Sequence, residues 1–395
     1  MQNQSRFFYN IARFASFIVA TFIFRRKILR NEIKGKKGPF VIIANHEAAL
    51  DFVNLIGVTK KPMRFVISNS FYSSLPLTKV FDKIGVIPKQ QFATTPSDMK
   101  KMKSVIENGE ILVIYPAGLM CEDGLSTPIP AATYKFLKWL NADVYVAKTI
   151  GTYFAMPKWA KGMRRGRTYM DIYKLFSKGE INSLEVPEIR KATENALLFD
   201  AYREQENYKV RYKNGDNIEG LQNVLYVCPH CFSEFSIKVK NKRTIYCEKC
   251  GFAHISDEFA FLHNASNQGD EMRYVSDWSK LIYSQLREKI KVNENSSLTA
   301  STDIFMVDKA RHRFSKVGFG DITLNNKCFL IKGEINGKKS EINVPITNFA
   351  SLPFSPGKHL EIQNGSDIYR CYLHDGKLVM KFINMVKIFY ELNLV

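Results

Sequence analysis

Short runs of apolar residues alternate with longer amphipathic stretches over the first half of the chain. The runs "PFVIIAN", "RFVISN", "ILVIYPAG" and "DVYVAKTIG" have the length and composition of buried strands. The segment from Ser97 to Asn108 is bracketed by Pro96 and Gly109, which predicts a helix. Strands that alternate with helices predict an α/β sandwich around a largely buried sheet, with its chemistry in the loops past the strand ends.

The second half of the chain has a different pattern. A polar stretch, "YREQENYKVRYKNGDNIEG", leads into a small cysteine-containing unit, which is followed by a predicted helix around 270–290 and a Ser/Thr/Asn-rich linker. Beyond residue 301, short alternating strands are joined by Asn-Gly and Asp-Gly turns and end in apolar residues at helical spacing, from Leu378 to Phe389. We expect a mostly-β domain capped by a helix, which resembles a pleckstrin-homology (PH) or GRAM-type module.

These patterns predict five segments in the 395 residues. In order, they are a membrane helix at 1–30, an α/β domain at 31–205, a linker with the cysteine unit at 206–262, a helical linker at 263–300, and the β domain at 301–395.

Composition and charge narrow the class of protein. The chain is 45% hydrophobic and 24% charged, which is typical of a globular protein. Its formal net charge of +19 favours polyanionic partners, either nucleic acid or an anionic membrane surface. Seven cysteines are too few for a disulfide scaffold, so a reducing, cytoplasmic setting is expected. The abundance of Lys, Asn, Ile and Phe is typical of an AT-rich, bacterial genome.

The stretch "RFFYNIARFASFIVATFIFRRK", residues 6–27, is the membrane candidate of the sequence. Its uncharged part, from Phe14 to Phe24, is shorter than the roughly 20 residues that span a bilayer. Arg25, Arg26 and Lys27 follow directly in place of the small-residue cleavage site of a signal peptide. We predict an interfacial helix with a basic edge that lies on anionic lipid at the cytoplasmic face of the cell membrane. The alternative is a buried helix that covers the next domain.

The motif "ANHEAALDF" places His46 and Asp51 directly after a predicted strand. On a regular helix, five residues separate two side chains by about 140°, so this pair meets only if His46 lies in the loop before the helix. A histidine held by a carboxylate has a fixed tautomer and can take a proton from a hydroxyl. By itself, this common spacing favours a polar helix start over a catalytic pair.

The blocks that follow add context. "NHEAALD", "IGVIPKQQF" at 84–92 and "VIYPAGLMCEDG" at 113–124 resemble the ordered motifs of the glycerolipid acyltransferase family, of the bacterial lysophosphatidate acyltransferase type. The resemblance covers about residues 1–200. It implies that His46 deprotonates an acceptor hydroxyl, Asp51 orients the imidazole, and the hydroxyl attacks the thioester of acyl-CoA or acyl-carrier protein. Backbone N–H groups near the sheet edge would hold the oxyanion.

The sequence also departs from the family pattern. Ala117 and Met120 stand where the third block has a glutamate and an arginine, and Gln91 stands where the second block ends in an arginine. Since guanidinium groups bind phosphate bidentately, the acceptor site is altered. Either basic residues elsewhere contact a phosphate, or the acceptor is not a phosphate monoester. The candidates for acceptor or phosphate binding are Lys89, Gly85, Gly118, and Arg164 and Arg165 of the basic run "PKWAKGMRRGR", a run that fits a solvated face equally well.

Four of the cysteines have the spacing of a zinc ribbon. Cys228 and Cys231 form one CxxC pair, Cys247 and Cys250 form another, and fifteen residues with two predicted strands separate them. Four thiolates in this arrangement predict a closed, structural Zn²⁺ site with no open position for catalysis. Cys121, Cys328 and Cys371 are expected to be ordinary buried or partly buried thiols.

Two functions are therefore open. The first is a membrane-associated acyltransferase of phospholipid biosynthesis that acylates a lysophospholipid-like acceptor, with 1-acylglycerol-3-phosphate as one candidate. The second is a non-catalytic scaffold of the same fold that binds lipid, protein or RNA through the zinc ribbon and C-terminal domain. We do not expect a dedicated nucleic-acid binder, because the basic residues are dispersed and no aromatic platform is evident. A protein partner at either of the last two modules is a further candidate.

Overall fold

The computed structural model describes residues 4–74, 78–90, 95–266, 268–293, 295–308 and 313–393. The chain divides into two compact units. The first consists of Met1–Pro157 and Gly162–Lys213, and the second of Lys158–Lys161 and Asn214–Val395. Each unit has its own sheets.

The first unit alternates helices and strands. Its elements are α1 Arg6–Ile18, the π-helix η1 Val19–Ile23, β1 Lys27–Asn31, β2 Phe40–Ala44, α2 Asp51–Ile56, β3 Met63–Ser68, α3 Asn69–Ser74, α4 Thr78–Ile84, β4 Ile87–Lys89, α5 Pro96–Glu107, β5 Ile111–Ile114, α6 Ala132–Leu140, β6 Asp143–Ile150, α7 Thr152–Ala155, β7 Tyr169–Phe176, α8 Lys178–Ser183, α9 Val186–Leu197 and α10 Ala201–Tyr208.

The seven strands of this unit form one sheet in the order β1-β7-β6-β2-β5-β3-β4. From β6 to β4 the neighbouring strands are parallel, so their carboxyl ends lie along one edge of the sheet. β7 runs antiparallel to β6, and β1 is parallel to β7 at the opposite border. The loops that follow β2, β5 and β6 therefore leave the sheet side by side, which is where an α/β sheet of this kind carries its chemistry.

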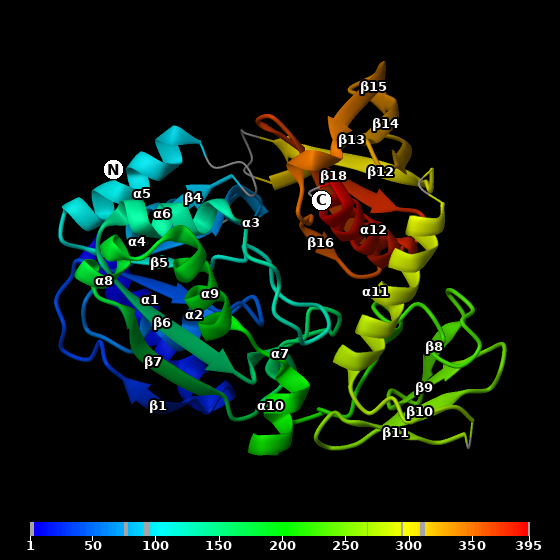
Figure 1. The fold of residues 1–395 in the computed structure, drawn as a ribbon, viewed down its shortest axis with the longest axis horizontal. Helices are drawn as coiled ribbons and strands as arrows, with labels where there is room; N and C mark the ends of the chain where they lie inside the picture. The colour runs from blue at the N-terminus through cyan, green and yellow to red at the C-terminus, as the bar shows by residue number, and fades with distance from the viewer. Residues whose placement is uncertain are drawn as a thin grey trace. The chain divides into compact units, whose positions relative to one another are not determined.

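Helices cover both faces of this sheet (Figure 1). Side chains alternate along β2 because successive Cβ atoms of a strand point to opposite faces. Val41 and Ile43 pack against the helices α5, α6 and α9, whereas Phe40, Ile42 and Ala44 belong to the layer that α1 and α2 cover. The α/β architecture predicted for the N-terminal half is confirmed.

The second unit begins with small hairpins and continues into a long helix and a larger sheet. Its elements are the 3₁₀-helix η2 Leu221–Asn223, β8 Ile237–Lys240, β9 Thr244–Cys247, β10 Ala253–Ser256, β11 Leu262–Asn264, α11 Val275–Val292, β12 Leu298–Asp308, β13 Arg313–Leu324, β14 Cys328–Ile335, β15 Lys338–Pro345, the 3₁₀-helix η3 Ile346–Asn348, β16 Phe354–Ser355, β17 His359–Asn364, β18 Asp367–Leu373 and α12 Leu378–Asn393.

The hairpins of the second unit make a four-stranded antiparallel sheet in the order β11-β10-β9-β8. Helix α11 packs against them through Trp278, which is fully buried. The indole Nε1–H of Trp278 donates to the Val227 carbonyl at 2.8 Å, and its ring lies edge-on to Phe252. Glu234 pairs with Lys289 of α11 and with Lys381 of α12. The hairpins and both helices are thus tied together by direct contacts.

The last seven strands form an antiparallel sheet in the order β15-β14-β13-β12-β18-β17-β16. β12 is its central strand and pairs with β13 on one side and β18 on the other. Asn336 and Gly337 both have positive φ between β14 and β15, as a tight hairpin turn requires. Helix α12 buries Val379, Phe382 and Val386 completely. The predicted mostly-β region with a terminal helix is confirmed, and its kinship with PH or GRAM modules stays a prediction.

Candidate active site

His46 and Asp51 meet in the loop between β2 and α2. Asp51 is the first residue of α2, and His46 lies before the helix, which is the condition that the sequence sets for contact. His46 Nδ1 lies 2.9 Å from Asp51 Oδ2. The Asp51 side chain is fully buried, whereas that of His46 is 20% exposed. The second ring nitrogen, Nε2, makes no hydrogen bond with the described residues and is the atom that a substrate can reach.

Two more donors fix the Asp51 carboxylate. The Ala48 backbone N–H donates to Asp51 Oδ2 at 3.0 Å. The Thr152 hydroxyl lies 2.6 Å from Asp51 Oδ1. Both oxygens of Asp51 therefore have fixed donors, and the carboxylate can hold His46 in the tautomer with its proton on Nδ1.

Asn45 clamps this loop to the neighbouring strand β6. Its amide Nδ2 donates to the Thr149 carbonyl at 2.7 Å, and the Thr149 N–H donates back to Asn45 Oδ1 at 2.7 Å. Both side chains are buried. Because β2 and β6 are parallel neighbours, the clamp fixes the residues that follow β2 relative to those that follow β6.

Glu47 lies directly behind the histidine and is fully buried. Its Oε2 lies 3.0 Å from the Thr152 hydroxyl and accepts the Tyr153 N–H at 2.9 Å. The Asn45 amide reaches Oε1 at 3.4 Å. Burial raises the pKa of Glu47 well above its usual range, and the nearby carboxylates of Glu204 and Asp51 raise it further. A second buried carboxyl group therefore belongs to the site.

The segment that follows β5 closes one side of the site. The Tyr115 ring lies 4.7 Å from the His46 ring, and the Cys121 N–H donates to the His46 carbonyl at 3.2 Å. Burial raises the pKa of the Cys121 thiol well above its usual range, and carboxylates around it, Glu47 first, raise it further. A thiol that resists ionisation is a poor nucleophile, in keeping with the expectation of an ordinary buried cysteine.

Three of the residues predicted for acceptor binding lie on the sheet edge or in its loops. Gly118 closes a turn with a hydrogen bond from its N–H to the Tyr115 carbonyl and has a φ of +69°. Gly85 has a φ of +76°, a left-handed conformation that favours glycine, and it lies against the guanidinium of Arg64. Lys89 ends β4, and its ammonium donates to the Gln90 carbonyl at 3.0 Å. Burial lowers the pKa of Lys89.

The two predicted arginines point to different environments. Arg164 is buried and Arg165 is exposed. The backbone N–H of Arg164 donates to the Ala155 carbonyl at 2.7 Å. The part of both arginines in phosphate binding stays a prediction. Ala117 and Met120 flank Gly118 and Leu119 in the loop after β5, and Gln91 lies outside the described residues.

The N-terminal helix exposes an apolar face. Within the described residues, Arg6–Ile23 is the one helix long and apolar enough to cross a membrane by length and composition, with a mean hydropathy of 1.2. Phe7, Phe14 and Phe22 are each at least 60% exposed. The opposite side is anchored, since Tyr9 is buried and its hydroxyl accepts the Met63 N–H. The helix ends before β1, so Lys27 to Arg30 of the predicted segment 1–30 are strand.

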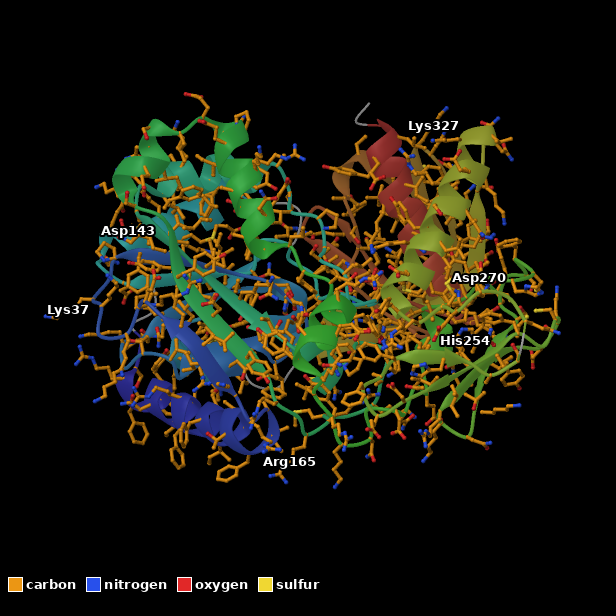
Figure 2. The ribbon with its side chains drawn as sticks, turned by 60° about the horizontal axis from the view of Figure 1, so that its bottom comes forward. Lys37, Asp143, Arg165, His254, Asp270 and Lys327 are labelled. Carbon is orange, nitrogen blue, oxygen red and sulfur yellow. The ribbon has the colours of Figure 1, made fainter. Side chains whose placement is uncertain are left out.

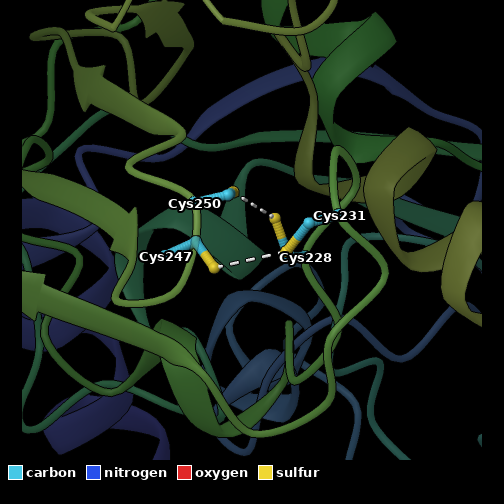
Figure 3. A group of neighbouring side chains, drawn as sticks. All are labelled: Cys228, Cys231, Cys247 and Cys250. Atoms are coloured by element: carbon cyan, nitrogen blue, oxygen red, sulfur yellow. Dashed lines mark hydrogen bonds between the residues drawn. The ribbon is translucent and has the colours of Figure 1, made fainter.

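The four cysteines of the predicted zinc site come together in the hairpins of the second unit (Figure 3). Their sulfur atoms all lie within 4.8 Å of one another. The pairs Cys228–Cys250 and Cys231–Cys247 have sulfur separations of 3.7 Å. Four Zn–S bonds of about 2.3 Å in a tetrahedron place sulfur atoms about 3.8 Å apart, so the cluster has the size of a tetrahedral thiolate site and can hold a metal.

One thiol of the cluster, that of Cys247, has a lowered pKa and ionises more easily than a free cysteine. Burial alone would raise the pKa of Cys247, but the Ser236 hydroxyl at 3.3 Å and the N–H groups of Cys250 and Lys249 lower it to about 6. A thiolate is the form that binds a metal.

Sequence reasoning missed Glu47 and Thr152 as parts of the site. Glu47 is adjacent to His46, and Thr152 follows β6 within the stretch "TIGTY". The parallel pairing of β2 and β6 brings the two loops together across 105 positions of sequence. The available signal was a polar residue in the first few loop positions after each of two strands that are neighbours in the sheet.

Comparisons with known proteins bear on the first unit above all. The family model described as Acyltransferase matches residues 25–152. The crystal structure of the 1-acyl-sn-glycerophosphate (LPA) acyltransferase PlsC from Thermotoga maritima is similar, with 15% identity, coverage of 51% of this chain and 78% of that chain, and a TM-score of 0.41. The Ran-binding domain of Nup2 from Ashbya gossypii gives 12% identity, 25% and 99% coverage, and a TM-score of 0.20. No curated protein matches the chain.

Proposed function

We propose that this chain, whose residues 25–152 match the family model described as Acyltransferase, is a glycerolipid acyltransferase that moves a fatty acyl chain from acyl-CoA or acyl-carrier protein to a hydroxyl of a lysophospholipid-like acceptor. The enzyme class is that of an O-acyltransferase. The observation that carries the proposal is the contact of 2.9 Å between His46 Nδ1 and Asp51 Oδ2, with His46 at the carboxyl edge of the sheet and partly exposed.

The reaction needs a base and a carbonyl polariser but no covalent enzyme intermediate. His46 takes the proton of the acceptor hydroxyl at Nε2 while the hydroxyl oxygen bonds to the thioester carbonyl carbon. The C–S bond then breaks, and the leaving thiolate takes the proton from the imidazolium. Asp51 accepts the Nδ1–H throughout and stabilises the positive charge that forms on the ring.

The exposed apolar face of α1 supports membrane association of the first unit. Insertion of Phe7, Phe14 and Phe22 into the boundary between headgroups and acyl chains would remove their rings from water. Backbone hydrogen bonds from Gly166 to Ile23 and from Thr168 to Phe24 bring the run that contains Arg165 and Arg167 to the end of η1.

Exposed cations therefore lie beside the apolar face. Arg25, Lys27, Arg165 and Arg167 are all exposed, and Figure 2 shows Arg165 at the border of the molecule close to the N-terminal helix. Basic side chains next to an anionic leaflet contribute about 1 kcal/mol each. We thus propose that the enzyme lies on the cytoplasmic face of an anionic membrane and takes its acceptor from that membrane.

We further propose that the four-cysteine cluster holds a structural Zn²⁺. A metal of this kind would stabilise hairpins whose strands are only three or four residues long. The closed set of four thiolates leaves no position for a substrate, so the metal takes no part in acyl transfer.

The decisive experiment is an acceptor screen by mass spectrometry. Purified protein is given isotope-labelled acyl-CoA in one arm and acyl-carrier protein in another, with lysophosphatidate and phosphate-free lysolipids as acceptors. His46→Ala should abolish transfer while the exposed His374→Ala, a matched control, retains it. An active His46→Ala protein would refute the assigned base. Absence of transfer to every acceptor would favour the scaffold function.

A further inference from the structure

We propose that Glu47 is a positioning residue that carries a proton at neutral pH and, through the Thr152 hydroxyl, holds the Asp51 carboxylate that orients His46. The inference rests on the proposed acyl transfer for its effect on rate, but its geometric basis is independent of the substrate. It adds two residues, Glu47 and Thr152, to the machinery of the site.

The first step concerns the Thr152 hydroxyl, which lies between two carboxyl groups. Thr152 Oγ1 is 2.6 Å from Asp51 Oδ1 and 3.0 Å from Glu47 Oε2. A hydroxyl has one hydrogen to donate, whereas an ionised carboxylate can only accept. Two ionised carboxylates would leave one of these contacts without a hydrogen. One of the two carboxyl groups therefore donates to Thr152.

The second step identifies the donor as Glu47. Asp51 accepts from the His46 ring and from the Ala48 N–H, and its separation of 2.6 Å from the Thr152 hydroxyl is typical of an O–H···O⁻ bond. Glu47 has only neutral partners: the Thr152 hydroxyl, the Tyr153 N–H and the Asn45 amide. Within the described residues no cation pairs with it.

The charges around Glu47 also favour its protonated form. Glu204, whose charge faces Glu47, is itself compensated by Lys148 at 2.9 Å, which leaves Glu47 as the carboxyl without a counter-charge. Burial is the main cause that raises the pKa of Glu47. The titratable groups that face Glu47 from the elements around it are Asp51, Glu204, Cys121 and Tyr212.

The consequence for the site is a set of hydrogen bonds that converge on the Asp51 carboxylate. Glu47 donates to Thr152, Thr152 donates to Asp51, and His46 donates its Nδ1–H to the other Asp51 oxygen. A neutral Glu47 also avoids a second negative charge beside the base. Loss of the Glu47 proton at high pH would break the hydrogen bond from Glu47 to Thr152. It would also place the negative charges of Glu47 and Asp51 on either side of the Thr152 hydroxyl, which weakens the contact that positions Asp51.

One test measures protonation without any substrate. The pKa of Glu47 is raised in the folded protein, so the folded state binds this proton more tightly than the unfolded chain. Stability is then lost as pH rises above the unfolded pKa of about 4.3 towards the folded value. Glu47→Gln removes this titration. Its melting temperature relative to wild type should rise steadily between pH 5 and pH 9, whereas that of the exposed Glu107→Gln control should stay constant. A constant difference for Glu47→Gln would overturn the proposal.

A second test measures the rate. Thr152→Val keeps the side-chain shape but removes the bridge, so kcat should fall by about 10 to 100-fold with little change in KM. Thr152→Ser should restore most of the loss. Wild type should lose kcat at alkaline pH, where Glu47→Gln should keep it. A Glu47→Gln protein as inactive as His46→Ala would contradict a protonated Glu47. If wild type acylates no acceptor, the proposed function is wrong, but the unfolding test still shows whether Glu47 carries a proton.

Discussion

The two clusters of reactive side chains in this molecule are held together by different means. In the first unit, His46, Asp51, Thr152 and Glu47 form a polar network at the edge of a parallel sheet, and two apolar layers pack around them. In the second unit, four cysteines lie on short hairpins, and the covering helix α11 supplies much of the buried apolar surface through Trp278. Hydrogen bonds order the first cluster, and a metal would order the second.

The difference shows what a polar site needs from its fold. Burying a carboxyl group costs several kcal/mol unless hydrogen bonds compensate it, and the compensating donors must be held in place by a core large enough to be rigid. The seven-stranded sheet supplies that core for Glu47 and Asp51. Hairpins with three or four residues per strand are too small for such a core, so metal coordination would add the stability that packing lacks there.

The largest effect is expected on removing the metal of the second unit. Structural Zn²⁺ contributes apparent binding energies of about 10–16 kcal/mol in zinc-finger peptides, so chelation or Cys247→Ser should unfold the hairpins β8 to β11. Hydrogen exchange should show lost protection there and around Trp278, and unchanged protection in the first unit. Cys328→Ser, which lies outside the cluster, is the control. Full protection of the hairpins in metal-free protein would mean that packing alone holds them.

The next largest effect is expected for Asp51→Asn. The neutral amide has one acceptor oxygen where the carboxylate uses two, and it lacks the charge that stabilises the imidazolium; in another enzyme the equivalent change lowers kcat by about 10⁴. We expect a loss of about 10² to 10⁴ in kcat, with the circular dichroism spectrum unchanged. Asp270→Asn, at an exposed position, should retain full activity. A fully active Asp51→Asn protein would mean that the aspartate only starts a helix.

The contrast between the clusters also explains what could be predicted from sequence. The cysteine spacing is local, and the distance from Cys228 to Cys250 is 22 positions. Strand positions were predictable because apolar runs mark buried strands. The contact of His46 with Asp51 was predictable on the condition that the histidine precedes the helix, and the structure places it there.

What could not be predicted depends on contacts distant in sequence. The Glu47 contact with Thr152 spans 105 positions, and no periodicity or spacing relates the two residues. The edge strand β1 was missed because its first four residues are exposed, so it lacks the apolar run that marks a buried strand. The close approach of Arg64 to Gly85 likewise becomes visible only when two strands and a helix are packed.

A smaller effect is expected at the apolar face of α1. Phe14 is 65% exposed, and burial of one such ring in lipid contributes about 1.5–3 kcal/mol. Phe14→Ser should therefore weaken co-sedimentation with vesicles that contain anionic lipid by roughly tenfold. Val292→Ser, at another exposed apolar position in the second unit, should have no effect. Equal binding of the Phe14 variant would favour a helix that covers protein in place of lipid.

The smallest effect is expected for Ser236→Ala, which tests whether hydrogen bonds around a metal site matter as they do in the polar network. The Ser236 hydroxyl lies 3.3 Å from Cys247 Sγ. Partners of this kind stabilise a thiolate and change metal affinity by about 10 to 100-fold. We expect zinc affinity, measured by competition with a chromophoric chelator, to fall by about tenfold while the hairpins stay folded in excess zinc. Because all four thiolates remain, this loss should be far smaller than that of Cys247→Ser. A loss of equal size would mean that the hydrogen bonds, and not the metal, order the second cluster as they order the first.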